Sequence, residues 1–262
     1  MFIIFIVLFF LFPILWIGFT SFKYAKDVNT LPPKIIFEPT MKNYFEVWQK
    51  QNFPNIYLNS IIVAFFSSLF VMLLAYPTAY AFARLKIWRK KDIAIWMLSC
   101  SMIPPIAVSI PIFLLFKTFG LYDSRIGLIL IHTGINLPLA IWLLTGFIKE
   151  IPHEIEESAM VDGCNQIQTI LKIVLPITFS GAISTAVLIF IFSWNEFLLA
   201  LVLTGQKSRT LPVAIYSFIN FREILWGPLT ASAVLVSLPV LIFSFFIRKY
   251  LVRGLTFGAV KG

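Results

Sequence analysis

Charged residues are scarce in this chain, at 13% of 262 residues, and so are cysteine and histidine, with two of each. Cys100 and Cys164 are too few for a disulfide framework, so we expect both thiols to be free. His132 and His153 lie in different segments, and no metal-ligand spacing surrounds either of them. No Gly-x4-Gly-Lys-Ser/Thr loop is present to hold nucleotide phosphates. The sequence therefore predicts neither a metal site nor a bound cofactor.

Apolar residues dominate instead: 59% of the chain is hydrophobic and 28 residues are phenylalanine. The mean hydropathy is +0.90, which is typical of integral membrane proteins. Because a spanning helix needs about 20 apolar residues, we predict an all-α membrane protein, one domain over 1–262. The six predicted spans are 2–21, 57–83, 93–116, 126–148, 177–203 and 229–250. The third contains Pro104, Pro105 and Pro111, so we expect it to be kinked or partly unwound.

The net charge is +9, which by itself would fit a nucleic-acid partner. The basic residues, however, form short clusters between apolar segments, as in loops next to lipid, and we expect no nucleic acid. Five cations lie within 84–91 and others within 248–261. The positive-inside rule then predicts cytoplasmic chain termini and a cytoplasmic loop at 149–176. Five lysines at 22–56 weaken this prediction, although they are more widely spaced and offset by acids.

The loop at 149–176 is far longer than the usual helix–helix connection of about 2–8 residues. Pro152 followed by carboxylates is typical of a helix start, because acids complement the positive end of the helix dipole. Gly163 is well placed to end that helix in a left-handed turn. Residues 166–174 predict a second short helix with one apolar face.

Two interpretations of this loop remain open on composition. An amphipathic helix of this kind can rest on the membrane surface. The loop carries four glutamates and one aspartate against two lysines, however, and an anionic lipid surface would repel it. A helix that docks on another protein fits the charge better.

The pattern E-x-A-x3-G-x9-I-x-L-P resembles the EAA loop of ABC-importer permeases. It is carried by Glu157, Ala159, Gly163, Ile173, Leu175 and Pro176. Asp162 before Gly163 fits the Asp-Gly pair of sugar-type importers, and Ser158 stands where the family usually has alanine. Further short motifs follow in the family's order along the whole chain, which is most similar to the smaller, maltose-transporter-like permease subunit.

The resemblance implies an ABC type I importer permease in the cytoplasmic (inner) membrane, with a coupling helix between the fourth and fifth spans. That helix, from Glu154 to Gly163, would dock on a separate ATPase, present as two subunits or as a homodimer. Glu157 would anchor it, either to a cation of the ATPase or by capping within the loop. The resemblance also implies a second permease subunit and an extracytoplasmic binding protein that delivers a sugar or oligosaccharide. This chain itself would have no catalytic residue, and ATP would be bound by the partner.

Glu196 stands out inside the fifth predicted span, about 9 Å from its centre if the helix is straight. Buried carboxylates in membranes are costly and usually functional, so Asn195 and Glu196 are candidates to line a polar translocation path. His132 and Asn136 share a face of the fourth span and are further candidates. For all four, a structural hydrogen bond between helices is the alternative.

An ion-gradient-driven secondary transporter is the alternative function. It would favour inverted repeats with intramembrane acids in both halves of the chain. Only Glu196 meets that expectation, and no internal repeat is evident.

Overall fold

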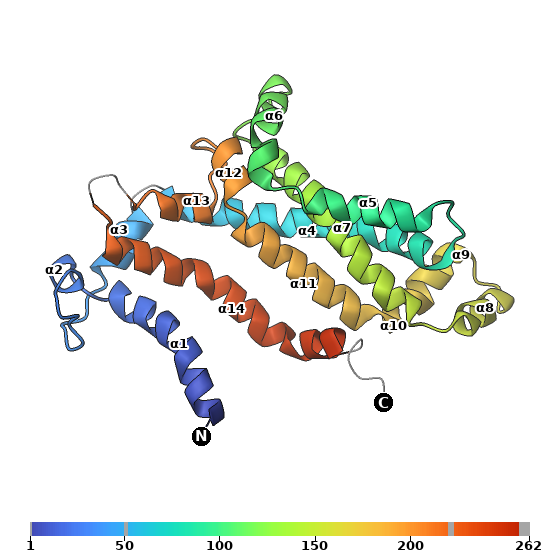
Figure 1. Ribbon diagram of the computed structural model, residues 1–262, viewed down its shortest axis with the longest axis horizontal. Helices are drawn as coiled ribbons and strands as arrows, with labels where there is room; N and C mark the ends of the chain where they lie inside the picture. The colour runs from blue at the N-terminus through green and yellow to red at the C-terminus, as the bar shows by residue number, and fades with distance from the viewer. Residues whose placement is uncertain (1, 50–51, 220–222, 257–262) are drawn as a thin grey trace. The chain divides into compact units, whose positions relative to one another are not determined.

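The computed structural model describes residues 2–49, 52–219 and 223–256, where the regular structure is helical (Figure 1). One isolated antiparallel bridge joins Ile219 to Ile224. The helices are α1 (Phe2–Ser21), α2 (Ala25–Val28), α3 (Lys42–Gln49), α4 (Phe53–Arg84), α5 (Lys90–Ser101), α6 (Pro105–Thr118), α7 (Arg125–Lys149), α8 (His153–Val161), α9 (Gln166–Thr169), the π-helical turn η2 (Ile170–Val174), α10 (Leu175–Ile177), α11 (Phe179–Asn195), α12 (Leu198–Leu203), α13 (Leu211–Tyr216) and α14 (Trp226–Thr256).

Four of these helices are long and apolar enough to cross a bilayer: α1, α4, α7 and α14. Two bent pairs also qualify by length and composition when each counts as one span. One is α5 with α6, bent by 86°, and the other is the stretch from α9 to α10 with α11, bent by 81°. The described residues thus contain four to six candidate spans, where the sequence predicts six.

The break expected in the third predicted span, 93–116, is confirmed. α5 ends at Ser101, and α6 begins at Pro105 after an extended Pro104. Pro105 disfavours the helical conformation at the residue before it, and neither proline has a backbone N–H to donate. The proline pair therefore separates two helices.

The fifth predicted span, 177–203, is wrong as one continuous helix. α11 ends at Asn195, and Glu196 has extended backbone angles. The two carboxylate oxygens of Glu196 accept hydrogen bonds from the backbone N–H groups of Leu199, at 2.8 Å, and Ala200, at 2.9 Å. Because this side chain satisfies the first free N–H groups of α12, it starts a new helix there. Glu196 is thus at a helix break and not inside a straight span.

The chain forms two compact units, residues 1–60 with 204–242 and residues 61–203 with 243–262. In the first unit, buried amides hold the loops to the helices. Asn43 of α3 donates to the carbonyls of Ser21 and Lys23, each at 2.8 Å. Asn59 of α4 donates to two carbonyls of the loop before α13, each at 2.9 Å. Such bonds satisfy backbone groups that the loops would otherwise bury unpaired.

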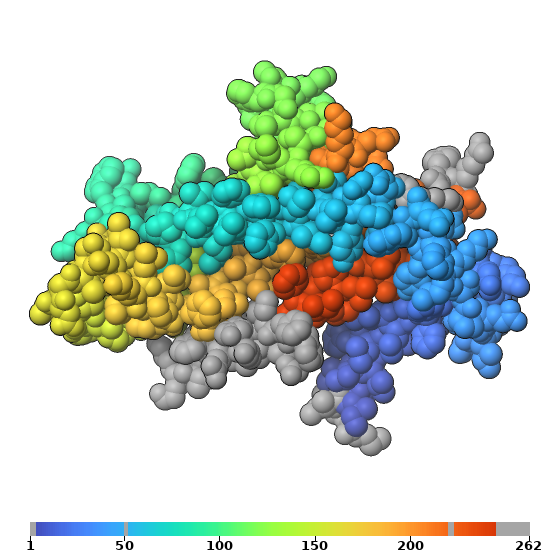
Figure 2. Space-filling model, turned by 180° about the vertical axis from the view of Figure 1, so that it is seen from behind, coloured from blue at the N-terminus to red at the C-terminus, as the bar shows by residue number. Residues whose placement is uncertain are grey.

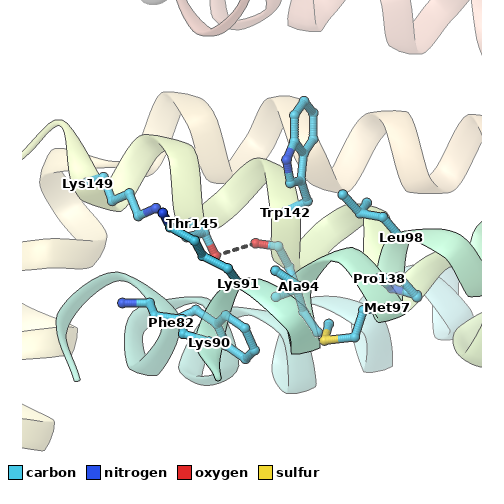
Figure 3. Close-up of a pocket in the computed structure, with 11 residues that line it drawn as sticks. Phe82, Lys90, Lys91, Ala94, Met97, Leu98, Pro138, Trp142, Thr145 and Lys149 are labelled. Atoms are coloured by element: carbon cyan, nitrogen blue, oxygen red, sulfur yellow. Dashed lines mark hydrogen bonds between the residues drawn. The ribbon is translucent and has the colours of Figure 1, made fainter. Parts of the chain in front are cut away.

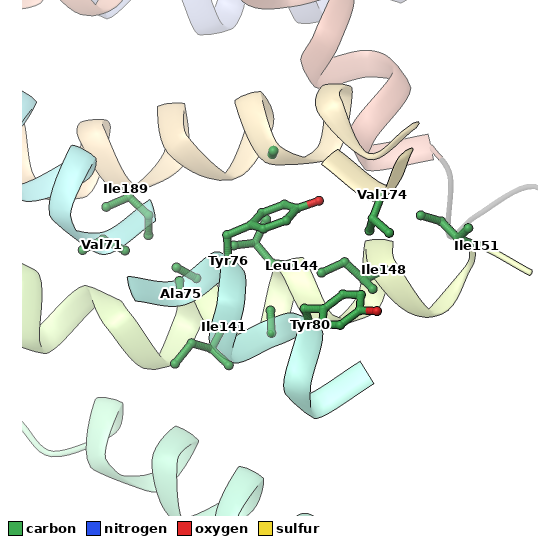
Figure 4. Packing of buried hydrophobic residues seen from close by; sticks show 13 residues of the cluster. Val71, Ala75, Tyr76, Tyr80, Ile141, Leu144, Ile148, Ile151, Val174 and Ile189 are labelled. Carbon is green, nitrogen blue, oxygen red and sulfur yellow. The ribbon is translucent and has the colours of Figure 1, made fainter. Parts of the chain in front are cut away.

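The core of the second unit is built from α4, α7 and α11 (Figure 4). Ala75 and Ala79 of α4 are fully buried, and their small side chains permit close helix contact. The same core includes Ile151 and Val174, which lie near the two ends of the 149–176 loop. The other buried members are Val71, Tyr76, Tyr80, Ala140, Ile141, Leu144, Ile148, Ala182 and Ile189. Both ends of the loop are therefore packed onto the helices of this unit.

Candidate functional site

The helix that the sequence predicts in the acidic loop is α8, which begins after Pro152 and ends at Val161. Gly163 follows with a φ of +89°, so the predicted left-handed turn is confirmed. Cys164 donates its backbone N–H to the carbonyl of Ala159 at 3.0 Å, which closes the end of the helix. Figure 2 shows this part of the chain, in yellow, at the molecular surface.

The second predicted helix, 166–174, is confirmed and continues to Ile177. A reciprocal capping box starts it: Asn165 and Gln168 each accept a hydrogen bond from the other's backbone N–H, both at 2.9 Å. The turn from Ile170 to Val174 is π-helical. Thr178 then ends α10, at the 81° bend into α11.

A buried carboxylate cluster holds α8 to α4; we call it the Glu156 cluster (Tyr80, Arg84 and Glu156). Arg84 Nε donates to Oε1 of Glu156 at 2.6 Å, and Tyr80 Oη donates to Oε2 at 2.9 Å. Arg84 Nη2 also reaches the carbonyl of Ile151 at 2.8 Å. The side chains of Arg84 and Glu156 are 6% and 3% exposed, so the ion pair is almost fully withdrawn from solvent. Every charge in the cluster is compensated, as a buried pair requires.

The residues that the sequence predicts for ATPase contact are mostly on the surface of this loop. Glu154, Glu157, Ser158, Asp162, Gly163 and Pro176 are exposed, Ile173 and Leu175 are half-buried, and Ala159 is buried. Among the described residues Glu157 has no hydrogen-bond or ion-pair partner, so capping within the loop is not observed. Its contact with a cation of the ATPase stays a prediction.

The same loop exposes large apolar side chains, and we call these the exposed apolar face: Ile155, Met160, Val161, Ile167 and Leu171. Val161 is 87% exposed and Ile167 is 68% exposed. Scattered exposed leucines or isoleucines are ordinary in proteins, whereas several on one short polar loop make it a candidate contact surface.

Two of the substrate-path candidates, His132 and Glu196, belong to a second buried group, which we call the Glu196 cluster (Ser67, His132, Ser193 and Glu196). Nδ1 of His132 lies 2.7 Å from Oγ of Ser193, and that hydroxyl lies 2.8 Å from Oγ of Ser67. Nε2 of His132 makes no hydrogen bond among the described residues and lies 3.5 Å from Oε2 of Glu196. The cluster joins α4, α7 and α11 at the point where α12 begins.

The four candidates for a substrate path differ in their positions. His132 is fully buried, and Asn136 donates its side-chain amide to the His132 carbonyl at 2.8 Å. Asn136 also lines a cavity of about 380 Å³ bounded by Leu199 and the α5–α6 break. Asn195 is exposed, and its amide donates to the Ile191 carbonyl at 2.9 Å. The structure therefore brings His132, Asn136 and Glu196 together and leaves Asn195 outside that group.

The described part of the chain holds no cluster of three or more histidine, cysteine or acidic residues that fits a metal ion. Cys100 and Cys164 are both free thiols.

Sequence reasoning missed Glu156, Tyr80 and Arg84 as one unit. A signal was present: Tyr80 and Arg84 are four residues apart and so share a face at the end of α4. A tyrosine and an arginine there predict a polar partner, and the acidic loop is the nearest source of one.

Comparison with known proteins gives a consistent result. Residues 72–257 match the family "Binding-protein-dependent transport system inner membrane component". The trehalose transport system permease protein SugB of Mycobacterium tuberculosis is 36% identical over 259 residues, which is 96% of this chain and 93% of that protein. The trehalose/maltose transport system permease protein MalG of Thermococcus litoralis is 34% identical over 257 residues, with 96% and 92% covered.

A solved structure shares the fold. It is a bacterial ABC transporter involved in the import of the acidic polysaccharide alginate, with a TM-score of 0.77 at 23% identity over 94% of this chain and 92% of that chain. Family membership decides against the ion-gradient-driven secondary transporter. The chain belongs to the binding-protein-dependent transport system inner membrane component family: it is a multi-pass permease subunit of an ABC importer in the inner membrane, and it is not itself an enzyme.

Proposed function

We propose that this permease carries a sugar or oligosaccharide and forms half of the translocation pathway, with a second permease subunit forming the other half. In this proposal six spans cross the membrane, both termini are cytoplasmic, and α8 is a cytoplasmic coupling helix between the fourth and fifth spans. Two ATPase subunits, or a homodimer of one, bind ATP below it. An extracytoplasmic binding protein delivers the substrate.

The observation that carries the coupling role is the Glu156 cluster. An ion pair that is buried on both sides resists separation, because removing either partner leaves an uncompensated charge. Arg84 and Tyr80 of α4 each donate a hydrogen bond to the Glu156 carboxylate of α8, and Arg84 donates another to the Ile151 carbonyl just before that helix, so α8 is held to α4 at more than one point. A force on α8 is therefore transmitted directly to a helix that spans the membrane.

The exposed apolar face supports the contact with the ATPase. When a protein cleft covers apolar side chains that were in water, the free energy falls by roughly 25 cal/mol for each Å² buried. Glu154, Glu157 and Asp162 of the same loop are exposed, so their carboxylates are available to cations of the partner. When two ATPases close around ATP, they would displace α8, and the spans would move as rigid bodies between inward- and outward-facing states.

The carbohydrate assignment is supported by the named relatives, which transport trehalose and maltose. Within the second unit, Asn136 would contact substrate, a role supported by its position in the lining of the cavity beside the α5–α6 break. Asn195 is also available, since its side chain is exposed. Glu196 and His132 would then hold these helices in place, because both are largely buried, His132 contacts Ser193, and Glu196 accepts hydrogen bonds from the start of α12.

Disulfide cross-linking tests the coupling role. The variant is Val161→Cys, in a chain in which Cys100 and Cys164 are replaced by serine, paired with single cysteines along the ATPase cleft. Val161 suits this test because it is 87% exposed, whereas Ala159 is only 7% exposed. The matched control is Ile36→Cys, which is 88% exposed and lies in the loop predicted to be extracytoplasmic.

We expect Val161→Cys to cross-link to the ATPase with an efficiency that changes when ATP is added, and Ile36→Cys to give no cross-link. Equal cross-linking of both positions, or none from Val161→Cys in a complex shown to be assembled, would contradict the coupling role.

A further inference from the structure

A groove runs between α5 and α7 in the second unit and encloses about 400 Å³ (Figure 3). Lys90 and Lys91 at the start of α5 and Lys149 at the end of α7 line the same end of the groove, which shows that the two helices run antiparallel there. From there the lining continues through Trp142 to Met97 and other apolar side chains beside the middle of α7. The groove is thus cationic at one end and apolar along the rest of its length.

The cationic end has little compensating negative charge. Lys91 and Lys149 make no ion pair with any described residue, and Lys90 donates only to the Leu85 carbonyl, at 3.3 Å. The nearby Asp92 is paired with Arg89 at 3.6 Å. Glu150, although it follows Lys149, lines a different cavity next to α8. The N-terminal end of α5 and the C-terminal end of α7 meet here, and their opposite helix dipoles offset each other, so the positive charge comes from the lysine side chains.

The geometry points to a binding site for an anionic phospholipid, with its phosphate among Lys90, Lys91 and Lys149 and an acyl chain along the apolar part of the groove. The lined stretch of α7, from Pro138 to Lys149, is about 16 Å long at the usual helical rise, enough for much of an acyl chain. A free phosphate ion would use only the cationic end and leave the apolar walls in water. This inference rests on the proposed orientation only in assigning the lipid to the cytoplasmic leaflet.

The test uses the complete transporter, purified in detergent, and native mass spectrometry with phosphatidylglycerol and phosphatidylcholine as the lipid probes. The variant is Lys91→Gln with Lys149→Gln. The control is Lys86→Gln with Lys117→Gln, which removes the same charge from exposed positions outside the groove. Each lysine near an anionic lipid contributes about a fivefold effect on binding, so the double variant should bind phosphatidylglycerol about 25-fold more weakly.

We expect the native transporter and the control to retain phosphatidylglycerol in preference to phosphatidylcholine, and the groove variant to lose that preference. Leu98→Trp, which fills the apolar part of the groove, should also reduce lipid binding while leaving the lysines in place. Size-exclusion chromatography of each variant checks that the complex is assembled.

Two results would overturn the inference. One is equal retention of phosphatidylglycerol by the groove variant and the control. The other is displacement of the lipid by millimolar inorganic phosphate together with no effect of Leu98→Trp, which would mark a site for a soluble anion. Neither result bears on the cross-linking of Val161→Cys, so the coupling role stands or fails separately.

Discussion

Glu156 and Glu196 are both carboxylates withdrawn from solvent in the second unit, but they are held in different ways. Glu156 is bound by side chains 72 and 76 residues away in the sequence, Arg84 and Tyr80. Glu196 is bound mainly by backbone N–H groups three and four residues ahead, with His132 at 3.5 Å. The first carboxylate fixes one helix against another, and the second shapes the chain locally where one helix ends and the next begins.

This difference predicts which part of the chain a substitution at each glutamate will destabilise. Loss of Glu156 leaves a buried guanidinium without its counter-charge and frees α8 from α4. Loss of the Glu196 charge weakens one helix start but leaves the packing of α11 in place. We therefore expect the two clusters to differ in the size of the stability effect and in which part of the chain loosens.

The largest effect should come from Glu156→Ala, which leaves the buried Arg84 without its counter-charge. Breaking a buried ion pair from one side costs about 3–5 kcal/mol, and here the loss should fall on the contact between α8 and α4. Hydrogen exchange of the assembled transporter should show α8 losing protection, together with a loss of ATP-driven uptake.

Glu157→Ala is the matched control for this exchange experiment, because Glu157 is the neighbouring glutamate on the same helix and is exposed. Its exchange protection should stay at the native level, whatever its effect on ATPase contact. If α8 loosened equally in both variants, the Glu156 cluster would not be what holds the helix.

A smaller effect is expected for Glu196→Gln. The amide keeps one acceptor for the backbone N–H groups of α12 but loses the charge, and a hydrogen bond to a charged group contributes about 2 kcal/mol. The apparent melting temperature of the assembled complex should fall, with KM for uptake unchanged. A changed KM at an unchanged melting temperature would instead place Glu196 in contact with the substrate.

Gly163→Ala should destabilise the end of α8 by about 1 kcal/mol, because an L side chain rarely adopts a φ of +89°. Beyond the two neighbouring residues in the chain, no atom lies within 4 Å of the added Cβ, so the effect is one of backbone conformation. Gly146→Ala in α7 is the control: it also meets nothing within 4 Å, and its φ is not in the left-handed region. Urea unfolding of the complex should separate the two variants, and equal stability would contradict the role of the turn.

The smallest effect is expected for Ser67→Ala, at about 0.5 kcal/mol, the lower end for one neutral hydrogen bond. Ser193 would keep its contact with His132 at 2.7 Å, so the Glu196 cluster should survive. Thermal unfolding measures the change, with Ser99→Ala on the exposed side of α5 as the control. A loss of stability as large as that for Glu156→Ala would contradict the prediction that the two clusters differ in their contribution to stability.

Much of the fold follows from the sequence because its determinants are local. Apolar runs of spanning length predict most of the long helices, and Pro104 with Pro105 predicts the break between α5 and α6. Gly163 predicts the end of α8, since few other residues suit a left-handed turn. The sequence does not predict the break at Glu196, because the break depends on hydrogen bonds between this side chain and the backbone ahead of it. The largely apolar run over 177–203 predicts a continuous helix instead.

The inward face of α8 was harder to predict. The sequence singled out Glu157 as the anchor, and the structure buries Glu156. A short helix that leaves Ile155 and Val161 exposed while it buries a glutamate inverts the usual amphipathic pattern. Only the arginine and tyrosine at the end of α4 account for that inversion, and their contact with the loop is tertiary.

The exposed apolar face also has a consequence for the life of the protein in the cell. A permease made in excess of its ATPase displays Met160, Val161 and Ile167 to water, which is the kind of surface that chaperones and proteases recognise. We expect unassembled copies to be degraded faster than assembled ones, so that the supply of ATPase sets the number of transporters. The same side chains that are proposed to contact the ATPase would then also report whether assembly is complete.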